Sequence, residues 1–435
     1  MIKRIEALNY RSLRYVAQEL RDFQVLVGPN ASGKSTFLDV VALLGDFVRF
    51  GVDDALLFGL NPERGRARSL DELIFNQIGD RFELAIELAV PDALRPVKRN
   101  GGGDFLPDAA RYEVAFGKAE SGQVEIQAEA LWLIDSQRAA ATPRRQGRVQ
   151  QLDLFPAEPS PPASIISSGK TPAGWQTVVK KSPHSGNDYF KAEGGKWNIQ
   201  YRVGARKAAL AGLPDDASRF PIAIWVRNLL LEGVRVLALN SAAMRRPVSP
   251  SALRRFSVEG ANLPLVVQDL ERHHPDVHRD WVAHVQTILP DLAAIQVHER
   301  PDDRHLYLAL KYASSVDPVP SWLASDGTLR LLTLTLLAYL PDSSGVYLIE
   351  EPENGIHPRA IAGVFQSLSS VYSGQVLVAT HSALFLGLAE PAQLLCFARN
   401  PSGAISIISG DNHPSLKTWR GEVDLSTLYA AGVLG

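Results

Sequence analysis

Residues 28–35 read Gly28-Pro29-Asn30-Ala31-Ser32-Gly33-Lys34-Ser35 and match the pattern G-x-x-x-x-G-K-S. An apolar, strand-like run at 23–27 precedes them, and an apolar, helix-like run at 35–44 follows. Glycines at these positions let successive backbone N–H groups curl toward one point, where the positive end of the helix dipole also lies. A chance glycine-rich turn would not need a strand before it and a helix after it. The segment therefore predicts a phosphate-binding loop.

The side chains of this loop predict ATP and Mg²⁺ as cofactors. Lys34 would contact the β- and γ-phosphates, and the Ser35 hydroxyl would ligate the metal. The predicted nucleotide-binding residues are Asn30, Ala31, Ser32, Gly33, Lys34, Ser35 and Thr36. A similar segment at 168–171, Ser-Gly-Lys-Thr, has Ser164 where the first glycine is required. We discard that second segment.

A second candidate element is the apolar run 346–349, which ends in Glu350-Glu351. Two adjacent carboxylates at the end of a buried strand are costly unless a cation neutralises them. Magnesium-bound ATP would supply that charge. We expect Glu350 to hold the metal, directly or through water, and Glu351 to orient and deprotonate the attacking water. The alternative is an exposed acidic turn that also includes Glu353.

A third element is the apolar run 376–379, which ends in Thr380-His381. His381 could donate a hydrogen bond to a γ-phosphate, and its position on the strand that follows Glu350-Glu351 favours that role over an ordinary strand-end histidine. The three elements together predict an ATPase, with Glu351 and His381 as its catalytic residues.

The composition limits the classes of protein to which the chain can belong. The chain has 435 residues, is 46% hydrophobic and carries a net charge of −2, so the whole molecule is not a strong electrostatic attractor for nucleic acid. The longest nearly apolar stretch, 331–340, is too short to cross a bilayer, and the N-terminus lacks the apolar core of a signal peptide. A single cysteine, Cys396, excludes an internal disulfide and is expected in the core. We expect a cytoplasmic protein without a membrane segment.

The chain divides into four parts in this interpretation. Residues 1–90 hold the phosphate loop and the N-terminal part of an α/β head, and 91–235 form an α/β insertion with a mobile loop at about 136–174 that is rich in Pro, Gln, Ser and Arg. Residues 236–300 are mainly helical, and 301–435 supply the C-terminal part of the head. Strands are expected at 82–88, 305–312, 346–350 and 375–379, with helices at 263–273 and 281–289.

The phosphate loop, the acidic strand end and the histidine, in this order and with Ser325-Asp326-Gly327 ahead of residue 346, resemble the ABC-type, AAA-family ATPase heads of the RecF, SMC and overcoming-lysogenization-defect (OLD) group. The resemblance implies an ABC-like P-loop head with a mixed central sheet. It also implies a dimer in which Ser325 and Gly327, in the signature-motif role, contact the γ-phosphate held by the other protomer's Lys34. The alternative role for these residues is a helix N-cap.

The same resemblance suggests further residues. Asn354 and His357 would contact the partner protomer, Arg11 matches a basic residue that follows the first strand, and Gln77 is a candidate Q-loop residue. Glu350 stands where many relatives have aspartate. The chain ends at Gly435, which leaves no room for the Toprim nuclease of OLD-type proteins, so a nuclease or other effector would be a separate partner.

Two further signals are weak. The histidines in 273–284 lack cysteine partners, and a polar helix end is favoured over a metal site. The basic cluster 144–148 could contact nucleic acid, although such runs are usually only solvated.

We expect a nucleotide-dependent dimer that acts as a switch or motor in nucleic-acid transactions, in antiphage defence or DNA repair. The alternatives are an ATP-dependent scaffold or toxin-holding protein with slow hydrolysis and, less favoured, a transporter's nucleotide-binding subunit.

Overall fold

The computed structural model describes residues 1–58, 65–95, 105–119, 122–140, 160–167, 170–181, 187–417, 425–430 and 432. The glycine run 101–103, the basic cluster 144–148, residues 168 and 169 and much of the loop expected at 136–174 lie outside these ranges. Within them, no helix is long and apolar enough to cross a membrane.

A six-stranded sheet joins the two ends of the chain. Its order is β10-β14-β15-β3-β16-β17, and all neighbouring strands are parallel except β16 and β17. The strands are β10 (Val234–Leu237), β14 (Gly345–Glu350), β15 (Gly374–Ala379), β3 (Phe23–Val27), β16 (Leu394–Arg399) and β17 (Ile405–Ser409). Strand β3 lies between two strands from the C-terminal part, so the predicted mixed central sheet is confirmed.

Both faces of this sheet are buried, which explains its nearly continuous apolar strands. Alternate residues of each strand pack into two different cores: in β14, Val346 and Leu348 face one core, and Tyr347 and Ile349 face the other. Helix α1 (Lys34–Phe50) covers the first face. Cys396 is buried in the second core, where burial raises the pKa of its thiol to about 12.

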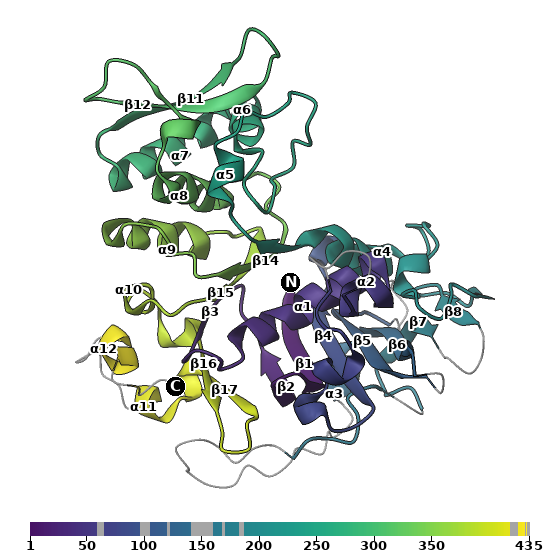
Figure 1. Cartoon of the computed structure of the whole chain (residues 1–435). Coiled ribbons are helices and arrows are strands. Elements are labelled where there is room, and N and C mark those ends of the chain that lie inside the picture. Colours follow the sequence, from purple (N-terminus) through teal and green to yellow (C-terminus); the bar gives the residue numbers. More distant parts are fainter. Residues whose placement is uncertain are drawn as a thin grey trace.

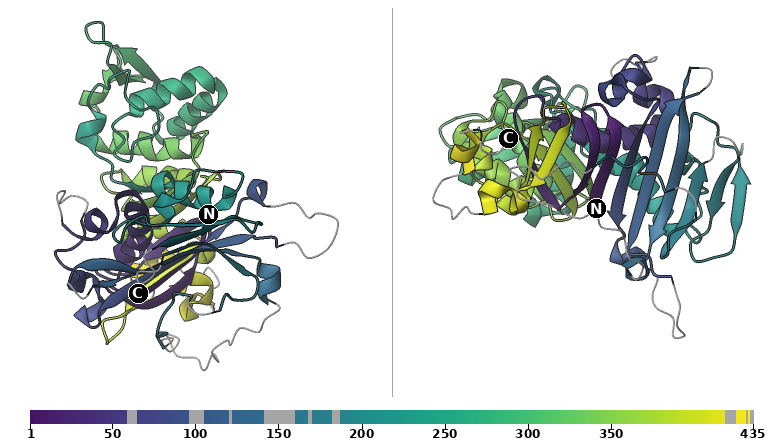
Figure 2. Two further views of the ribbon diagram at one scale, coloured as in Figure 1. Left: turned by 90° about the vertical axis from the view of Figure 1, so that its right-hand side faces the viewer. Right: turned by 90° about the horizontal axis from the view of Figure 1, so that it is seen from below.

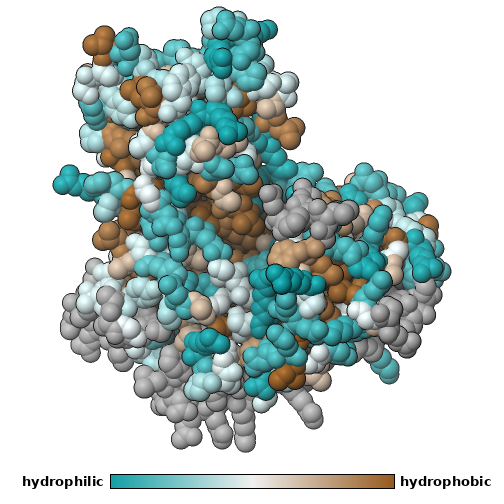
Figure 3. Space-filling model, in the orientation of Figure 1, coloured by the Kyte–Doolittle hydropathy of each residue, from teal (hydrophilic) through white to brown (hydrophobic). Residues whose placement is uncertain are grey.

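The second face is covered by helices of a lobe that rises above the sheet (Figures 1 and 2). These helices are α5 (Ser241–Met244), α6 (Leu263–His273), α7 (Pro275–Ile288), α8 (Asp326–Leu336) and α9 (Ile361–Ser369). The lobe also holds a small antiparallel sheet of β11 (Leu292–Glu299), β12 (Leu306–Tyr312) and β13 (Val319–Pro320). Figure 3 shows a recess with apolar residues between this upper lobe and the lobe to its right.

An antiparallel sheet of eight strands forms the right-hand lobe of Figure 1, in the order β2-β1-β4-β5-β6-β7-β8-β9. Its strands are β1 (Ile2–Tyr10), β2 (Leu13–Glu19), β4 (Arg81–Ala89), β5 (Ala109–Lys118), β6 (Val124–Ile134), β7 (Trp175–Lys181), β8 (Asp188–Lys191) and β9 (Asn198–Tyr201). Helices α2 (Val52–Leu56), α3 (Ser136–Ala140) and α4 (Pro221–Asn228) belong to the same half of the chain. Because β4 pairs with β5 from Arg81 to Ala89, this sheet runs across the expected boundary near residue 90.

The face of this sheet that points away from α1 carries a buried charge network around Arg111 of β5. The Arg111 guanidinium contacts Glu6 at 2.8 Å, Glu87 at 3.0 Å and Glu113 at 2.9 Å, and its side chain is 5% exposed. Nη2 of Arg111 also donates to the carbonyl oxygen of Ile165 at 3.0 Å. Burial alone would lower the pKa of the guanidinium, but the carboxylates outweigh it and the pKa is raised.

Residues 160–167 cover this network. The Ile165 N–H donates to Glu83 at 2.7 Å, and the Ser167 N–H donates to Glu113 at 2.8 Å. The side chains of Glu83 in β4 and Glu113 in β5 therefore lie in a buried polar layer and not in water.

Candidate nucleotide-binding site

The backbone of the phosphate loop lies between the carboxyl end of β3 and the first turn of α1. Gly28 has φ 154° and Gly33 has φ 90°, and a Cβ atom at Gly28 would lie 2.4 Å from the carbonyl oxygen of Phe397. Only glycine fits both positions without strain. Gly33 is the N-cap residue of α1, and because glycine has no side chain, no side chain caps this helix start. The first N–H groups of α1 are thus available to an anion.

Lys34 is folded over the loop that precedes it. Its Nζ donates to the carbonyl oxygens of Gly28 at 2.8 Å and Pro29 at 3.0 Å, and it lies 3.4 Å from the hydroxyl of Ser32. Lys34 is 6% exposed, and burial lowers the pKa of its ammonium to about 8 although Glu350 and Glu351 raise it. Attraction to negatively charged phosphate oxygens would offset the desolvation cost of this buried ammonium.

Ser35 and Glu350 meet across the sheet, 315 positions apart in the chain. The Ser35 hydroxyl donates to Oε2 of Glu350 at 2.7 Å. This contact follows from the sheet order, because β14 and β3 both flank β15 in parallel and so end at the same edge. A hydroxyl and a carboxylate are hard oxygen ligands of the kind that Mg²⁺ prefers, and the pair fits that ion when nucleotide phosphates complete its shell.

Glu351 follows the strand in a left-handed backbone conformation, with φ 48°. Its N–H donates to the carbonyl oxygen of Ala379 on β15 at 2.8 Å, and its Oε2 accepts a hydrogen bond from the side-chain amide of Asn354. A residue without glycine's freedom is strained in this conformation, and the contacts on both sides hold it there. The Glu351 side chain is 46% exposed, so water can reach it.

His381 lies beside Glu351 at the end of β15. Its Nε2 is 4.0 Å from Oε1 of Glu351, and its Nδ1 is 3.4 Å from the hydroxyl of Tyr429. Tyr429 belongs to α12 (Leu425–Ala430) and also donates to the carbonyl oxygen of Gly28 at 3.3 Å. Tyr429 could not be identified from the sequence, since a lone tyrosine carries no motif.

Ser325 and Gly327 lie at the start of α8, in the upper lobe (Figure 1). The Ser325 hydroxyl accepts a hydrogen bond from the N–H of Thr328 at 3.1 Å, so this serine is an N-cap. A Cβ atom at Gly327 would lie 2.3 Å from the carbonyl oxygen of Gly355. The helix start therefore packs on the turn that follows Glu351. Within the described residues, the Ser325 side chain bonds to Thr328, and no hydrogen bond or ion pair joins it to residues 28–36.

The remaining predicted residues have local contacts. Arg11 contacts α1: its guanidinium is 3.2 Å from a carboxylate oxygen of Asp39 on that helix. The Nδ1 of His357 accepts a hydrogen bond from the N–H of Arg359 at 3.2 Å. Gln77 lies in a tight turn with φ 58°. The structure thus brings together the phosphate loop, Glu350, Glu351, Asn354 and His381, while Ser325 and Gly327 form a separate surface beside the same turn.

Comparisons with known proteins show the family and the fold of the chain. The sequence model of the family described as "AAA domain, putative AbiEii toxin, Type IV TA system" matches residues 23–140 and 210–387. No curated protein is significantly similar in sequence. The matched residues include β3, the phosphate loop, α8, Glu350, Glu351 and His381, and they leave out 141–209.

Two solved structures share the fold over nearly the whole chain. One is an SMC head bound to the C-terminal winged-helix domain of ScpA, with a TM-score of 0.51 and 14% identity over 94% of this chain and 97% of that chain. The other is an SMC head with an extended coiled coil, bound to the C-terminal domain of ScpA and derived from Pyrococcus furiosus, with a TM-score of 0.50 and 12% identity over 94% and 95%. The fold is that of an ABC-type ATPase head, and the family model identifies the chain as a member of the AAA-domain family that it describes.

Proposed function

We propose that the protein binds and hydrolyses ATP with Mg²⁺, as a nucleotide-dependent dimer that acts as a switch or motor. The observation that carries this proposal is the 2.7 Å contact between Ser35 and Glu350, because it joins the phosphate loop to the acidic strand end. ATP turnover by the purified chain tests it. Mg²⁺-dependent release of phosphate is the expected result, and a chain that releases none, with or without nucleic acid, would contradict hydrolysis.

Each residue of the site has a distinct part in this proposal. The N–H groups of residues 30–36 and the Lys34 ammonium bind the phosphates, and Ser35 and Glu350 hold the metal. Mg²⁺, when bound, neutralises charge on the phosphate oxygens. Glu351 orients the attacking water and takes its proton, since its carboxylate is exposed beside the loop. His381 donates a hydrogen bond to the γ-phosphate.

Dimerisation would complete the site. Two observations support a dimer in which Ser325 and Gly327 contact the partner: Ser325 is exposed, and the start of α8 packs on the turn at 351–357, where Gly327 lies against Gly355 and Arg330 donates to the carbonyl oxygen of Asn354 at 3.2 Å. A small hydroxyl residue and a glycine at a helix start form an anion site, which would take the γ-phosphate held by the partner. In the same arrangement, Asn354 and His357 would face the partner protomer.

Replacing Ser325 by aspartate separates its role as a helix cap from its role at the dimer interface. Aspartate is as good an N-cap as serine, so we expect Ser325→Asp to change the free energy of unfolding by less than about 0.5 kcal/mol. Its carboxylate would repel the γ-phosphate, and the ATP-dependent dimer should be lost in sedimentation. Ser325→Ala should instead lose about 1 kcal/mol of stability. An Asp variant that still dimerises with ATP would restrict Ser325 to capping.

The lowered pKa of Lys34 predicts that ATP binding depends on pH. Phosphates favour the ammonium form, so the pKa is higher in the complex than its value of about 8 in the free protein. Above pH 8 binding therefore takes up a proton, and the affinity should fall by up to about tenfold per pH unit. Calorimetry in two buffers of different ionisation enthalpy measures that proton. The Lys34→Arg variant keeps its positive charge at high pH, so its affinity for ATP should not fall with pH. If the affinity falls equally in both proteins, Lys34 is not the group that takes up the proton.

Nucleic acid is the partner that we propose for this switch, with a separate nuclease or other effector protein. The proposal rests on the resemblance to RecF, SMC and OLD heads and on the SMC heads whose structures contain a bound domain of another protein. Antiphage defence and DNA repair are the processes in which such a device would work. ATP turnover measured with and without double-stranded DNA tests the nucleic-acid part, and stimulation by DNA is the expected result.

A second candidate function is an ATP-dependent scaffold or toxin-holding protein with slow hydrolysis. The family description favours it, because that description names a toxin of a toxin–antitoxin system. ATP turnover measured with and without DNA, and with candidate partner proteins, distinguishes the two. Slow turnover that DNA does not change would favour the second candidate, and DNA-stimulated turnover would favour the first.

A further inference from the structure

A cavity lies at the edge of the six-stranded sheet that holds the amino ends of β10 and β14, opposite the edge with the phosphate loop. It has a volume of about 570 Å³ and is lined by the start of β10, by α6 and by residues 254–256 and 340–344. Strands β10 and β14 are parallel, and Arg235 pairs in register with Tyr347, near the amino ends of both strands. The phosphate loop follows the carboxyl end of β3, so the two sites are separate.

Arg235 is the unusual residue of this cavity. It is 7% exposed, and its Nη1 donates to the hydroxyl of Tyr347 at 2.8 Å. The guanidinium carbon also lies 5.3 Å from the centroid of the Tyr347 ring. Burial raises the pKa of Tyr347, so the phenol is neutral and cannot balance the charge. Among the described residues, no carboxylate lies within ion-pair distance of Arg235, whose hydrogen bond is to Tyr347.

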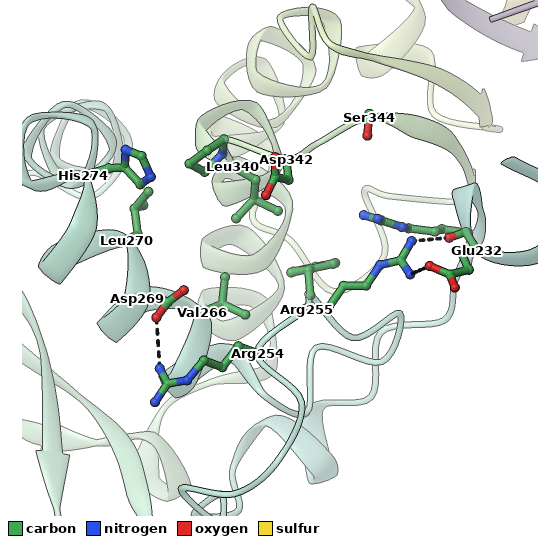
Figure 4. Close-up of a pocket in the computed structure, with 13 residues that line it drawn as sticks. Glu232, Arg254, Arg255, Val266, Asp269, Leu270, His274, Leu340, Asp342 and Ser344 are labelled. Carbon is green, nitrogen blue, oxygen red and sulfur yellow. Dashed lines mark hydrogen bonds and ion pairs between the residues drawn. The ribbon is translucent and has the colours of Figure 1, made fainter. Parts of the chain in front are cut away.

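Two of the carboxylates that line the cavity already have other partners. Arg255 contacts Glu232 at 2.7 Å, and Arg254 contacts Asp269 at 3.0 Å (Figure 4). Burial lowers the pKa of Arg235 and the charge of Arg255 lowers it further, and these effects outweigh Tyr347 and Glu232, which raise it. Each of the two neighbouring arginines thus has a paired carboxylate, while Arg235 has only the longer-range attraction of Glu232, which Arg255 already holds.

Asp342 also lines the cavity, but its side chain is exposed and Figure 4 places it beside Leu340, away from the Arg255–Glu232 pair. A buried cation without a counter-ion costs several kcal/mol in general, and a bound anion removes that cost. The rest of the wall is apolar, with Phe256, Val266 and Leu270. The volume lies in the range of small-molecule sites.

We propose that this cavity binds a small organic acid, whose single carboxylate pairs with Arg235 and whose apolar body packs on Phe256, Val266 and Leu270. A guanidinium and a carboxylate match in charge and in planar geometry. One uncompensated positive charge favours a singly charged group over a doubly charged phosphate monoester. The site is independent of ATP, since none of its lining residues belongs to the phosphate loop, Glu350, Glu351 or His381.

Benzoate is the probe for this proposal, with phenyl phosphate and benzyl alcohol as matched ligands. The full chain is unfolded by heat at constant ionic strength with each compound, and saturation-transfer NMR reports binding directly. We expect benzoate to raise the Tm by about 2 °C or more at saturation and to give a transfer signal. Benzyl alcohol lacks the charge and should do neither. A larger effect of phenyl phosphate would overturn the choice of a carboxylate.

Arg235→Met should abolish both effects of benzoate, because it removes the buried charge and keeps the volume. Arg279→Met is the matched control: Arg279 is exposed on α7 and pairs with Asp276, so its loss should leave the benzoate effects unchanged. Should the Arg235 variant fail to fold, Arg255→Gln provides the test: it frees the Glu232 carboxylate, which then competes with benzoate for Arg235, and binding should weaken at least tenfold. Benzoate effects that persist in the Arg235 and Arg255 variants, or no effect in the wild type, would refute the proposal.

Discussion

Replacing Glu351 by glutamine should lower the ATP turnover number by about 10²- to 10⁴-fold while the affinity for Mg²⁺-ATP stays within a few fold. Glutamine keeps the size of the side chain and can still accept from Asn354, but it cannot take a proton from water. Because nucleotide then remains bound, the ATP-dependent dimer should accumulate. Single-turnover phosphate release and sedimentation with ATP measure the two effects.

Glu271→Gln is the control for this variant. Glu271 is exposed on α6, away from the site, and its substitution removes the same charge from the surface. Its turnover should match that of the wild type. Full activity in the Glu351 variant would show that another group activates the water, and His381 would then be the first candidate.

The largest effect on stability is expected at Arg111. Its guanidinium contacts Glu6, Glu87 and Glu113, and the Glu113 side chain is fully buried. Arg111→Met leaves these carboxylates without their cation, and removing one partner of a buried ion pair typically costs 3–5 kcal/mol. We therefore expect the free energy of unfolding to fall by about 3–5 kcal/mol. Urea unfolding followed by circular dichroism measures the loss.

Lys118→Met provides a comparison on the same strand. Lys118 pairs with Asp71 at the surface, where the two side chains are 39% and 40% exposed, and such pairs contribute about 1 kcal/mol or less. A similar loss of stability in the two variants would mean that burial does not strengthen the Arg111 network. A stable Arg111 variant would mean that the carboxylates take up protons instead.

The sequence predicted the parts of the fold that have strong local patterns. The strands before the phosphate loop and before Glu350 and His381 were expected from apolar runs, and all three lie in the six-stranded sheet. Helix α6 was expected at its observed bounds, Leu263–His273. These elements could be predicted because consecutive residues alone reveal two patterns: the apolar run of a strand buried on both faces, and apolar residues that recur with the period of a helix.

The contacts between distant segments could not be predicted in the same way. Alternation of the kind seen in β4 is typical of a strand with one face in water, yet Glu83 is buried because residues 160–167 cover that face. That covering segment lies in a stretch rich in Pro and Ser with little apolar pattern. Tyr429 reaches His381 only through the path of the last helix. Arg235 belongs to no sequence motif, and its lack of a paired carboxylate depends on which carboxylates the fold places elsewhere.

The central claim is that one triphosphate binds between the loop at 28–35 and the carboxylates at the end of β14. A crystal structure with Mg²⁺ and a non-hydrolysable ATP analogue tests it most directly. We predict that Lys34 Nζ leaves the carbonyl oxygens of Gly28 and Pro29 for the phosphates, and that Mg²⁺ lies between Ser35 and Glu350. Nucleotide bound elsewhere, or a loop lysine that keeps its present contacts beside a bound analogue, would contradict the claim.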